Sequence, residues 1–271
     1  MASELEPYFD DDAERLAYET FCAEQERGGA AFTLDAPTLV CRWRMHAKHV
    51  PLLNRHIRAL SQRRVNGAPL GHGVLSWAKQ HVEWSLAEGA YAERDGVLML
   101  VVDVNGNAAM SVGAYEPLAD ASRTALAARA EGARVEAAET GIAPEVLCAA
   151  APDGRVLLGA APDEHLCAVA TLIEQLAETR GHAVERVLSN GEGASTDMAL
   201  CAAMSAAGSG AAFFLVSDEH GVVPAAENAG IDGVSAADTA CGVASATNSA
   251  VDSDAAAFVD FLAAGYRKLF S

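Results

Sequence analysis

The residues best suited to chemistry are cations gathered in one part of an acidic chain. The 271-residue sequence carries a formal net charge of −18, yet no Asp or Glu lies between Ala36 and Val82. The same stretch holds six arginines and two lysines. Charge segregated in this way is typical of a surface or pocket that receives a small anion or an acidic partner. We therefore expect a small anionic ligand to meet this stretch.

Two of the arginines lie in a segment with the pattern of a strand. Residues 38–46 alternate apolar and polar side chains, and alternating side chains of a strand point to opposite faces. One face would carry Leu39, Cys41, Trp43 and Met45; the other would carry Val40, Arg42, Arg44 and His46. Arg42 and Arg44 are therefore candidates for contact with an anion.

The segment that follows, residues 48–64, has the pattern of a helix. On a helical wheel His49, His56 and Arg63 fall inside the apolar stripe, whereas Arg55 and Arg58 point away from it. The polar groups in the stripe are either core or interface residues with hydrogen-bond partners, or the lining of a polar pocket that holds an anion. A metal shared by the two histidines is not expected, because seven helical residues separate them by about 10 Å of rise.

The elements that must position these residues alternate between helix and strand, which predicts an α+β fold. With 51% hydrophobic residues the chain can bury a substantial core. We expect two domains, residues 1–118 and 119–271. A hairpin, helix and strand unit is predicted twice. Its first copy places a helix at 117–131 and a strand at 132–136, and its second places strands at 146–158, a helix at 162–180 and a strand from 184.

Several classes of function are excluded or disfavoured by composition. The six cysteines form no C-x-x-C pair, so neither a zinc ribbon nor a thioredoxin-like motif is present. The N-terminus is acidic where a secretory signal would be basic, and no apolar run reaches the roughly 20 residues of a membrane helix, so we expect a cytoplasmic protein. A pI near 4.7 disfavours nucleic acid as a partner. Residues 234–252, small and polar, are expected to form a long loop.

One family resembles this chain. The segment His49–His56 (HVPLLNRH) resembles the H-L-x-R-L-x-x-S helix of class IV, or fold-type IV, pyridoxal-phosphate aminotransferases. Similar stretches follow in the same order at 144–147 with Asp153-Gly154, at 181–186, and at 212–217 before 221–224. The resemblance covers about residues 38 to 233.

The resemblance implies a particular architecture and cofactor. It implies two α+β domains with pyridoxal phosphate between them, a homodimer, and an arginine near the first strand that binds the cofactor phosphate. Arg42 or Arg44 is the nearest match to that arginine. Together with the wheel, this makes the cofactor-binding candidates Arg42, Arg44, His49, His56 and Arg63. Another α+β fold with repeated hairpin, helix and strand units is the alternative.

The sequence departs from the family at its catalytic residue. These enzymes hold the cofactor as a Schiff base on a lysine, and the chain has only Lys48, Lys79 and Lys268. The region expected to supply that lysine, about residues 120 to 150, instead holds Arg123, Arg129 and Arg134, and arginine stays protonated. The glutamate that would pair with the pyridine nitrogen is not recognisable after Gly154. The catalytic residue is therefore unassigned.

Three functions from different classes follow. The first is that the chain is a divergent relative of these enzymes that binds pyridoxal phosphate or another small anion and could act on an amino acid. Alternatively, it is a non-catalytic binding or scaffold protein that uses its cationic surface, including Arg55 and Arg58, for a partner. The third possibility is a hydrolase that uses Ser217, Asp218 and His220, although this string lacks a nucleophile elbow.

Overall fold

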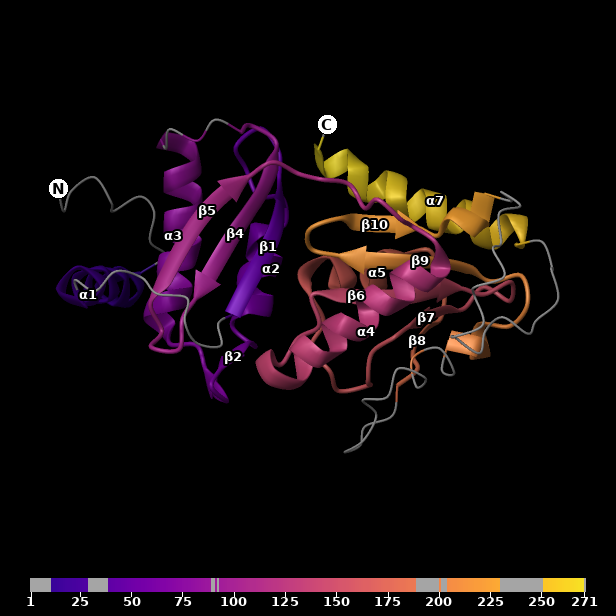
Figure 1. Ribbon diagram of the computed structural model, residues 1–271, viewed down its shortest axis with the longest axis horizontal. Coiled ribbons are helices and arrows are strands. Elements are labelled where there is room, and N and C mark those ends of the chain that lie inside the picture. The colour runs from indigo at the N-terminus through magenta and orange to yellow at the C-terminus, as the bar shows by residue number, and fades with distance from the viewer. Residues whose placement is uncertain are drawn as a thin grey trace. The chain divides into compact units, whose positions relative to one another are not determined.

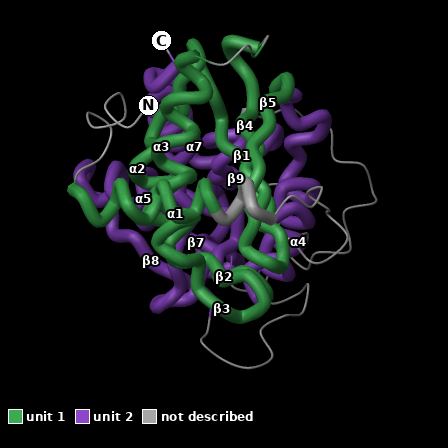
Figure 2. The backbone as a smooth tube through the Cα atoms, turned by 90° about the vertical axis from the view of Figure 1, so that its left-hand side faces the viewer, with its two compact units in different colours: residues 1–115, 139–141 green, residues 116–138, 142–271 purple. Residues whose placement is uncertain are grey.

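The computed structural model describes residues 11–28, 39–88, 91, 93–188, 200, 204–229 and 251–270. The chain forms two compact units (Figure 2). Unit 1 comprises residues 1–115 and 139–141, and unit 2 comprises residues 116–138 and 142–271. The expected domain boundary at 118 stays a prediction. The loop expected at 234–252 lies almost entirely outside the described residues, as do Cys201 and Cys241.

Unit 1 is built on a three-stranded antiparallel sheet of order β1-β4-β5 (Figure 1). Its strands are β1 (Leu39–Met45), β4 (Gly96–Val102) and β5 (Ala108–Gly113). The helices of this unit are α1 (Asp12–Gly28), α2 (Leu53–Leu60) and α3 (His72–Glu88), and a small hairpin joins β2 (Arg64–Val65) to β3 (Ala68–Pro69). Helices α1 and α3 pack on each other, and α2 also contacts α3.

One face of this sheet carries the core of unit 1. The alternation predicted for β1 is confirmed, because Leu39, Cys41, Trp43 and Met45 are all buried, whereas Arg42 is exposed. These side chains join a cluster with residues of the helices, among them Leu60 and Trp77. Apolar burial of this kind is the main source of stability in a domain of this size.

The helix expected at 48–64 is much shorter in the structure. Helix α2 begins at Leu53 and ends at Leu60. Ala47 and Lys48 have left-handed φ angles of 47° and 64°, and His46 and His49 exchange two backbone hydrogen bonds of 2.8 Å across them. A two-residue turn therefore occupies the start of the expected helix. Pro51 also restrains the residue before it from the helical region.

Unit 2 is built on a five-stranded sheet of order β10-β9-β6-β7-β8, in which only β7 and β8 pair in parallel. Its strands are β6 (Glu145–Ala150), β7 (Val156–Leu158), β8 (Val184–Arg186), β9 (Ala212–Ser217) and β10 (Gly221–Pro224). Its helices are α4 (Arg123–Thr140), α5 (Ala168–Thr179) and α7 (Ser253–Arg267), with short 3₁₀ turns η3 (Ser205–Ala207), η4 (Ala226–Ala229) and η7 (Lys268–Phe270).

Both faces of the central strands of this second sheet are covered. Every residue of β6 and β9 is buried. Leu126 and Ala130 of α4 pack in one cluster with Leu147 of β6 and Leu215 of β9. Helices α5 and α7 also contact β9, and α7 extends along the sheet as the yellow helix of Figure 1. Strands that are buried on both faces have largely apolar sequences, as β6 and β9 do.

The α+β class is confirmed, and the repeated unit is confirmed in its second copy alone. Strands β6 and β7, helix α5 and strand β8 follow in the expected order, with α5 starting at Ala168 rather than at 162. In the first copy the strand expected at 132–136 is wrong, because these residues belong to α4, which runs from Arg123 to Thr140. The segment is rich in alanine, the strongest helix former, and its single Gly132 does not end the helix. None of the helices in the described part of the chain has the length and apolar character needed to cross a membrane.

Candidate anion-binding site

The sheet of unit 1 separates the candidate residues into two groups. The ring of His56 stacks on Trp43, with ring centroids 4.9 Å apart, so His56 lies on the core face of β1. Arg42 and Arg44 occupy the alternate positions of the strand and point to the opposite face. His56 therefore does not share a face of β1 with Arg42 and Arg44.

Two of the candidates, His56 and Arg63, are buried inside the fold. His56 is 3% exposed and Arg63 is 4% exposed. The Nη1 atom of Arg63 donates a 3.2 Å hydrogen bond to the Oγ1 of Thr140, a residue that also belongs to unit 1. A buried polar group with a partner inside the fold has a structural role, and this hydrogen bond gives Arg63 such a role. A role for His56 and Arg63 in binding an anion stays a prediction.

The position expected for His49 is wrong. His49 is exposed and lies at the end of the tight turn that precedes α2, so its side chain does not belong to the apolar stripe of the helix. The helical wheel placed it there because the wheel assumes helical geometry from residue 48. Three left-handed residues before the helix, Ala47, Lys48 and Leu52, break that geometry.

The opposite face of the sheet carries two cations in a row. Arg42 is exposed, Arg44 is half-buried, and the guanidinium carbon of Arg44 lies 3.4 Å from the ring centroid of Tyr115. In the sheet, Arg42 of β1 pairs with Met99 of β4, which pairs with Ser111 of β5. In the same way, Arg44 pairs with Val97, which pairs with Gly113. We call this surface the arginine face: Arg42, Arg44, Ser111, Gly113 and Tyr115.

The electrostatics of the arginine face favour an anion. Strands β1, β4 and β5 contain no Asp or Glu, although the whole chain has 37 acidic residues. A Cβ atom built on Gly113 would meet nothing within 4 Å, so there is open space in line with Arg44. The ring of Tyr115 holds the Arg44 guanidinium by a cation–π contact. A planar guanidinium held in this way can form paired hydrogen bonds with a phosphate or a carboxylate.

The lysines do not fit a Schiff base at this site. The Nζ atom of Lys79 lies 3.7 Å from the Oε1 of Glu14, in an ion pair between α3 and α1. Lys48 is part of the tight turn, and Lys268 is exposed on η7. None of the three stands on β1, β4 or β5. Strand β7, which follows Gly154, is formed by Val156–Leu158 and offers no glutamate for a pyridine nitrogen. Strands β1, β4 and β5 therefore offer no amine that could hold pyridoxal phosphate as an imine.

The residues of the hydrolase alternative have structural partners. The Oγ of Ser217 accepts hydrogen bonds of 3.2 Å from the backbone N–H groups of Glu219 and His220. The carboxylate of Asp218 accepts hydrogen bonds from Val169 and Ala168 at the start of α5. The Nη2 of Arg129 lies 3.4 Å from the Nε2 of His220. Ser217 and His220 are thus linked through backbone N–H, which is not the nucleophile–base contact that a triad requires.

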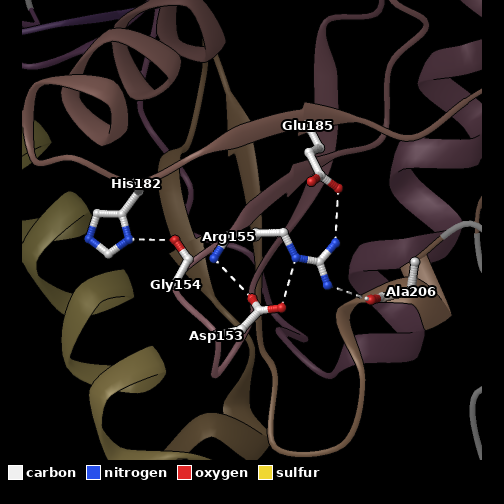
Figure 3. A network of polar contacts seen from close by, with 6 residues as sticks. All are labelled: Asp153, Gly154, Arg155, His182, Glu185 and Ala206. Carbon is white, nitrogen blue, oxygen red and sulfur yellow. Dashed lines mark hydrogen bonds and ion pairs between the residues drawn. The ribbon is translucent and has the colours of Figure 1, made fainter.

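A second polar cluster, in unit 2, ties secondary-structure elements together (Figure 3). The guanidinium of Arg155 contacts the carboxylates of Asp153 and Glu185 at 2.8 Å and 2.9 Å, and donates to the carbonyl oxygen of Ala206 at 3.4 Å. The Nδ1 of His182 lies 2.8 Å from the carbonyl oxygen of Gly154. These contacts join the β6–β7 turn to β8 and η3, so the cluster is structural.

Asp95 lies beside the arginine face, and the sequence pattern did not identify it. The Oδ1 of Asp95, just before β4, lies 2.5 Å from the Nδ1 of His46. The alternation of residues 38–46 already placed His46 on the same side as Arg42 and Arg44. Its partner could not be found from spacing, because only the register of β1 and β4 brings Asp95 opposite His46.

No family model and no curated protein matches the chain. Among solved structures, it is similar to a hypothetical aminotransferase from Mycobacterium tuberculosis, at 12% identity and a TM-score of 0.45, over 72% of this chain and 84% of that one. It is also similar to 4-amino-4-deoxychorismate lyase from Pseudomonas aeruginosa, at 14% identity and a TM-score of 0.39, over 72% of this chain and 87% of the other. A putative amino-acid aminotransferase from Mesorhizobium loti matches at 19% identity and a TM-score of 0.36, over 69% and 97%.

Proposed function

We propose that the arginine face binds a small anion, pyridoxal phosphate or another phosphate-bearing compound, without a covalent bond to a lysine. The observation that carries this proposal is the placement of Arg42 and Arg44 on one face of a sheet whose strands contain no carboxylate, in a chain of net charge −18. Cations that gather on one surface of an acidic protein raise the local concentration of anions there.

The two arginines can reach the same anion. Residues two apart on a strand are separated by about 6.7 Å, and a guanidinium on a long side chain extends well beyond its Cα atom. Tyr115 restrains Arg44, so less side-chain entropy is lost when that arginine binds. Hydrogen bonds between guanidinium and phosphate are charge-assisted and short. Because Arg42 is exposed, salt weakens the attraction, and binding decreases as ionic strength rises.

The sequence resemblance extends this proposal to a divergent, aminotransferase-like protein that acts on an amino acid and assembles as a homodimer. The second candidate is a binding or scaffold protein without catalytic activity. It is favoured by the positions of the three lysines, because none stands on the strands of the arginine face. In that case Arg55 and Arg58 of α2 would contribute to the surface that meets the partner.

The experiment uses two vitamers. Pyridoxal phosphate can form an imine, whereas pyridoxine 5′-phosphate has the same phosphate and ring but no aldehyde. We expect both compounds to raise the melting temperature by a similar amount. Borohydride treatment with pyridoxal phosphate should fix no stoichiometric adduct to one lysine.

The matched control is Arg58→Gln, which removes one exposed arginine from α2 without touching the arginine face. Arg44→Gln should lose the thermal shift and Arg58→Gln should keep it. A stoichiometric borohydride adduct on Lys48 or Lys79, found by peptide mapping, would show that binding is covalent. If neither compound shifts the melting temperature of the wild-type protein, the arginine face does not bind this class of anion.

A further inference from the structure

An imidazole continues the row of cations on the arginine face. His46 follows Arg44 by two residues, directly after β1, and so takes the next position on the same side of the strand. The register pairs Met45 with Gly96, which brings His46 opposite Asp95. The Nδ1 of His46 and the Oδ1 of Asp95 are 2.5 Å apart. The carboxylate therefore fixes the orientation of the ring.

The backbone beside this pair is strained, and Asp95 and Arg94 hold it in place. Ala47 and Lys48 both have positive φ angles, which are unfavourable for residues with a side chain. The turn is held because the N–H of Ala47 donates to the Oδ1 of Asp95 at 3.0 Å and the N–H of Lys48 donates to the carbonyl oxygen of Arg94 at 2.8 Å. Strained residues persist where the surroundings determine them strongly, often at functional positions.

The same contacts keep the carboxylate charged. The hydrogen bond from Ala47, and then the contact with His46, hold the pKa of Asp95 below its ordinary value of 3.8. A carboxylate on Nδ1 directs the Nε2 atom of the ring toward other partners, and in imidazolium both ring nitrogens are donors.

We propose that His46, positioned by Asp95, is the third anion contact of the arginine face and donates a hydrogen bond to the bound anion when its ring is protonated. This inference rests on the proposed function. Arg42, Arg44 and His46 then form one row of contacts, spaced by about 6.7 Å along β1. Two guanidinium groups and one imidazolium carry three positive charges, which complement the charge of a dianion, such as a phosphomonoester, better than that of a single carboxylate.

The proposed contact between His46 and the anion requires a protonated ring, whereas the arginines are always charged, so pH distinguishes the two kinds of contact. The ionisable residues beside His46 are Asp95 and Arg94 in the facing segment, Lys48 and His49 in the turn, and Arg44 with Tyr115 on the arginine face. Imidazole is the side chain that serves as a pH switch near neutrality. His46 and His49 are the histidines named in this neighbourhood, and His49→Gln is therefore the matched control for His46→Gln.

The test measures the affinity for sulfate, a dianion whose own charge is constant over this range, by calorimetry at pH 6 and pH 8 and constant ionic strength. We expect the wild-type protein to bind sulfate about fivefold more tightly at pH 6, the size of one exposed ion pair. His46→Gln should bind sulfate equally at both pH values, and more weakly than the wild-type protein at pH 6. His49→Gln should keep the pH difference.

The Asp95→Asn variant provides a second measurement. Removing the charge that faces the imidazolium should reduce the pH difference, and circular dichroism confirms that the variant remains folded. If His46→Gln keeps the full pH difference while Arg44→Gln loses sulfate binding, the inference about His46 is wrong and the proposed function stands. If the wild-type protein does not bind sulfate at either pH, both are wrong.

Discussion

The carboxylate of Asp218 accepts a 2.9 Å hydrogen bond from the backbone N–H of Val169, the second residue of helix α5. Its other oxygen lies 3.4 Å from the N–H of Ala168. Cys167, the N-cap residue of α5, makes no side-chain hydrogen bond to the helix. Asp218, which follows β9 in the β9–β10 turn, therefore supplies the cap from another part of the chain. A carboxylate at this position also interacts favourably with the helix dipole.

The first prediction concerns this cap. Asp218→Ala should lower the free energy of unfolding by about 1 to 2 kcal/mol, because it leaves buried N–H groups without an acceptor. Urea unfolding followed by circular dichroism measures the effect. The control is Asp163→Ala, an exposed residue before the start of α5, which should change stability by less than about 0.5 kcal/mol. Equal stability of the two variants would show that Asp218 does not cap the helix.

The second prediction separates a structural Ser217 from a catalytic one. Ser217 is 1% exposed and its Oγ accepts from two backbone N–H groups of the β9–β10 turn. Ser217→Ala should therefore destabilise the protein by about 1 kcal/mol in urea unfolding. A hydrolytic role predicts the reverse pattern, in which stability is unchanged and an esterase activity of the wild-type protein disappears.

The third prediction tests the packing of the sheet that carries the arginine face. A Cβ atom on Gly96 would clash with the carbonyl oxygen of Gly113, and the backbone of β5 would have to move. Gly96→Ala should lower the melting temperature by several degrees, at about 1 to 3 kcal/mol of overpacking. Gly113→Ala is the matched control, because its Cβ would meet nothing within 4 Å. Two variants with the same melting temperature would contradict the described register of β4 and β5.

The fourth prediction concerns the β4–β5 turn and acid stability. Asp103 is buried, which by itself raises the pKa of its carboxyl, but hydrogen bonds from Asn107 and Asn105 outweigh this and hold the pKa below its ordinary value of 3.8. A carboxyl with a lowered pKa in the folded state stabilises the protein above its unfolded pKa and loses that contribution as pH falls through its folded pKa.

The stability of the wild-type protein should therefore fall more between pH 5 and pH 3 than that of Asp103→Asn. The measurement is the melting temperature of both proteins at those pH values. If the two curves run parallel, the carboxylate of Asp103 does not contribute to the acid sensitivity of the fold.

The local sequence pattern predicted most of the helices and strands, but it did not predict on which face of the sheet each candidate residue lies. The alternation of β1 and the apolar stripe of α2 put the correct sides of Trp43 and His56 toward the core. Each pattern defines an inward side for one element alone. It does not say that α2 packs its inward side against the face of β1 that is opposite to Arg42 and Arg44. The sequence pattern therefore groups the five candidates into one site, whereas the fold places His56 on the face of β1 opposite to Arg42 and Arg44.

The remaining differences come from backbone geometry and tertiary pairing. The left-handed turn at Ala47 and Lys48 lacks the Asn-Gly sequence usual for such turns, so residues 48–52 had the pattern of a helix. The contact between His46 and Asp95 depends on the pairing of β1 with β4. Similarly, Arg134 and Val135 were expected in a strand and lie in α4, where alanine content outweighs one glycine.

The most direct test of the central claim is the dissociation constant for pyridoxine 5′-phosphate, measured by calorimetry on the wild-type protein and on Arg44→Gln and Arg58→Gln. Binding at the arginine face predicts a loss of at least about fivefold in Arg44→Gln, because a charge-assisted contact is removed. It predicts wild-type affinity in Arg58→Gln. Equal dissociation constants for all three proteins would contradict anion binding at Arg44.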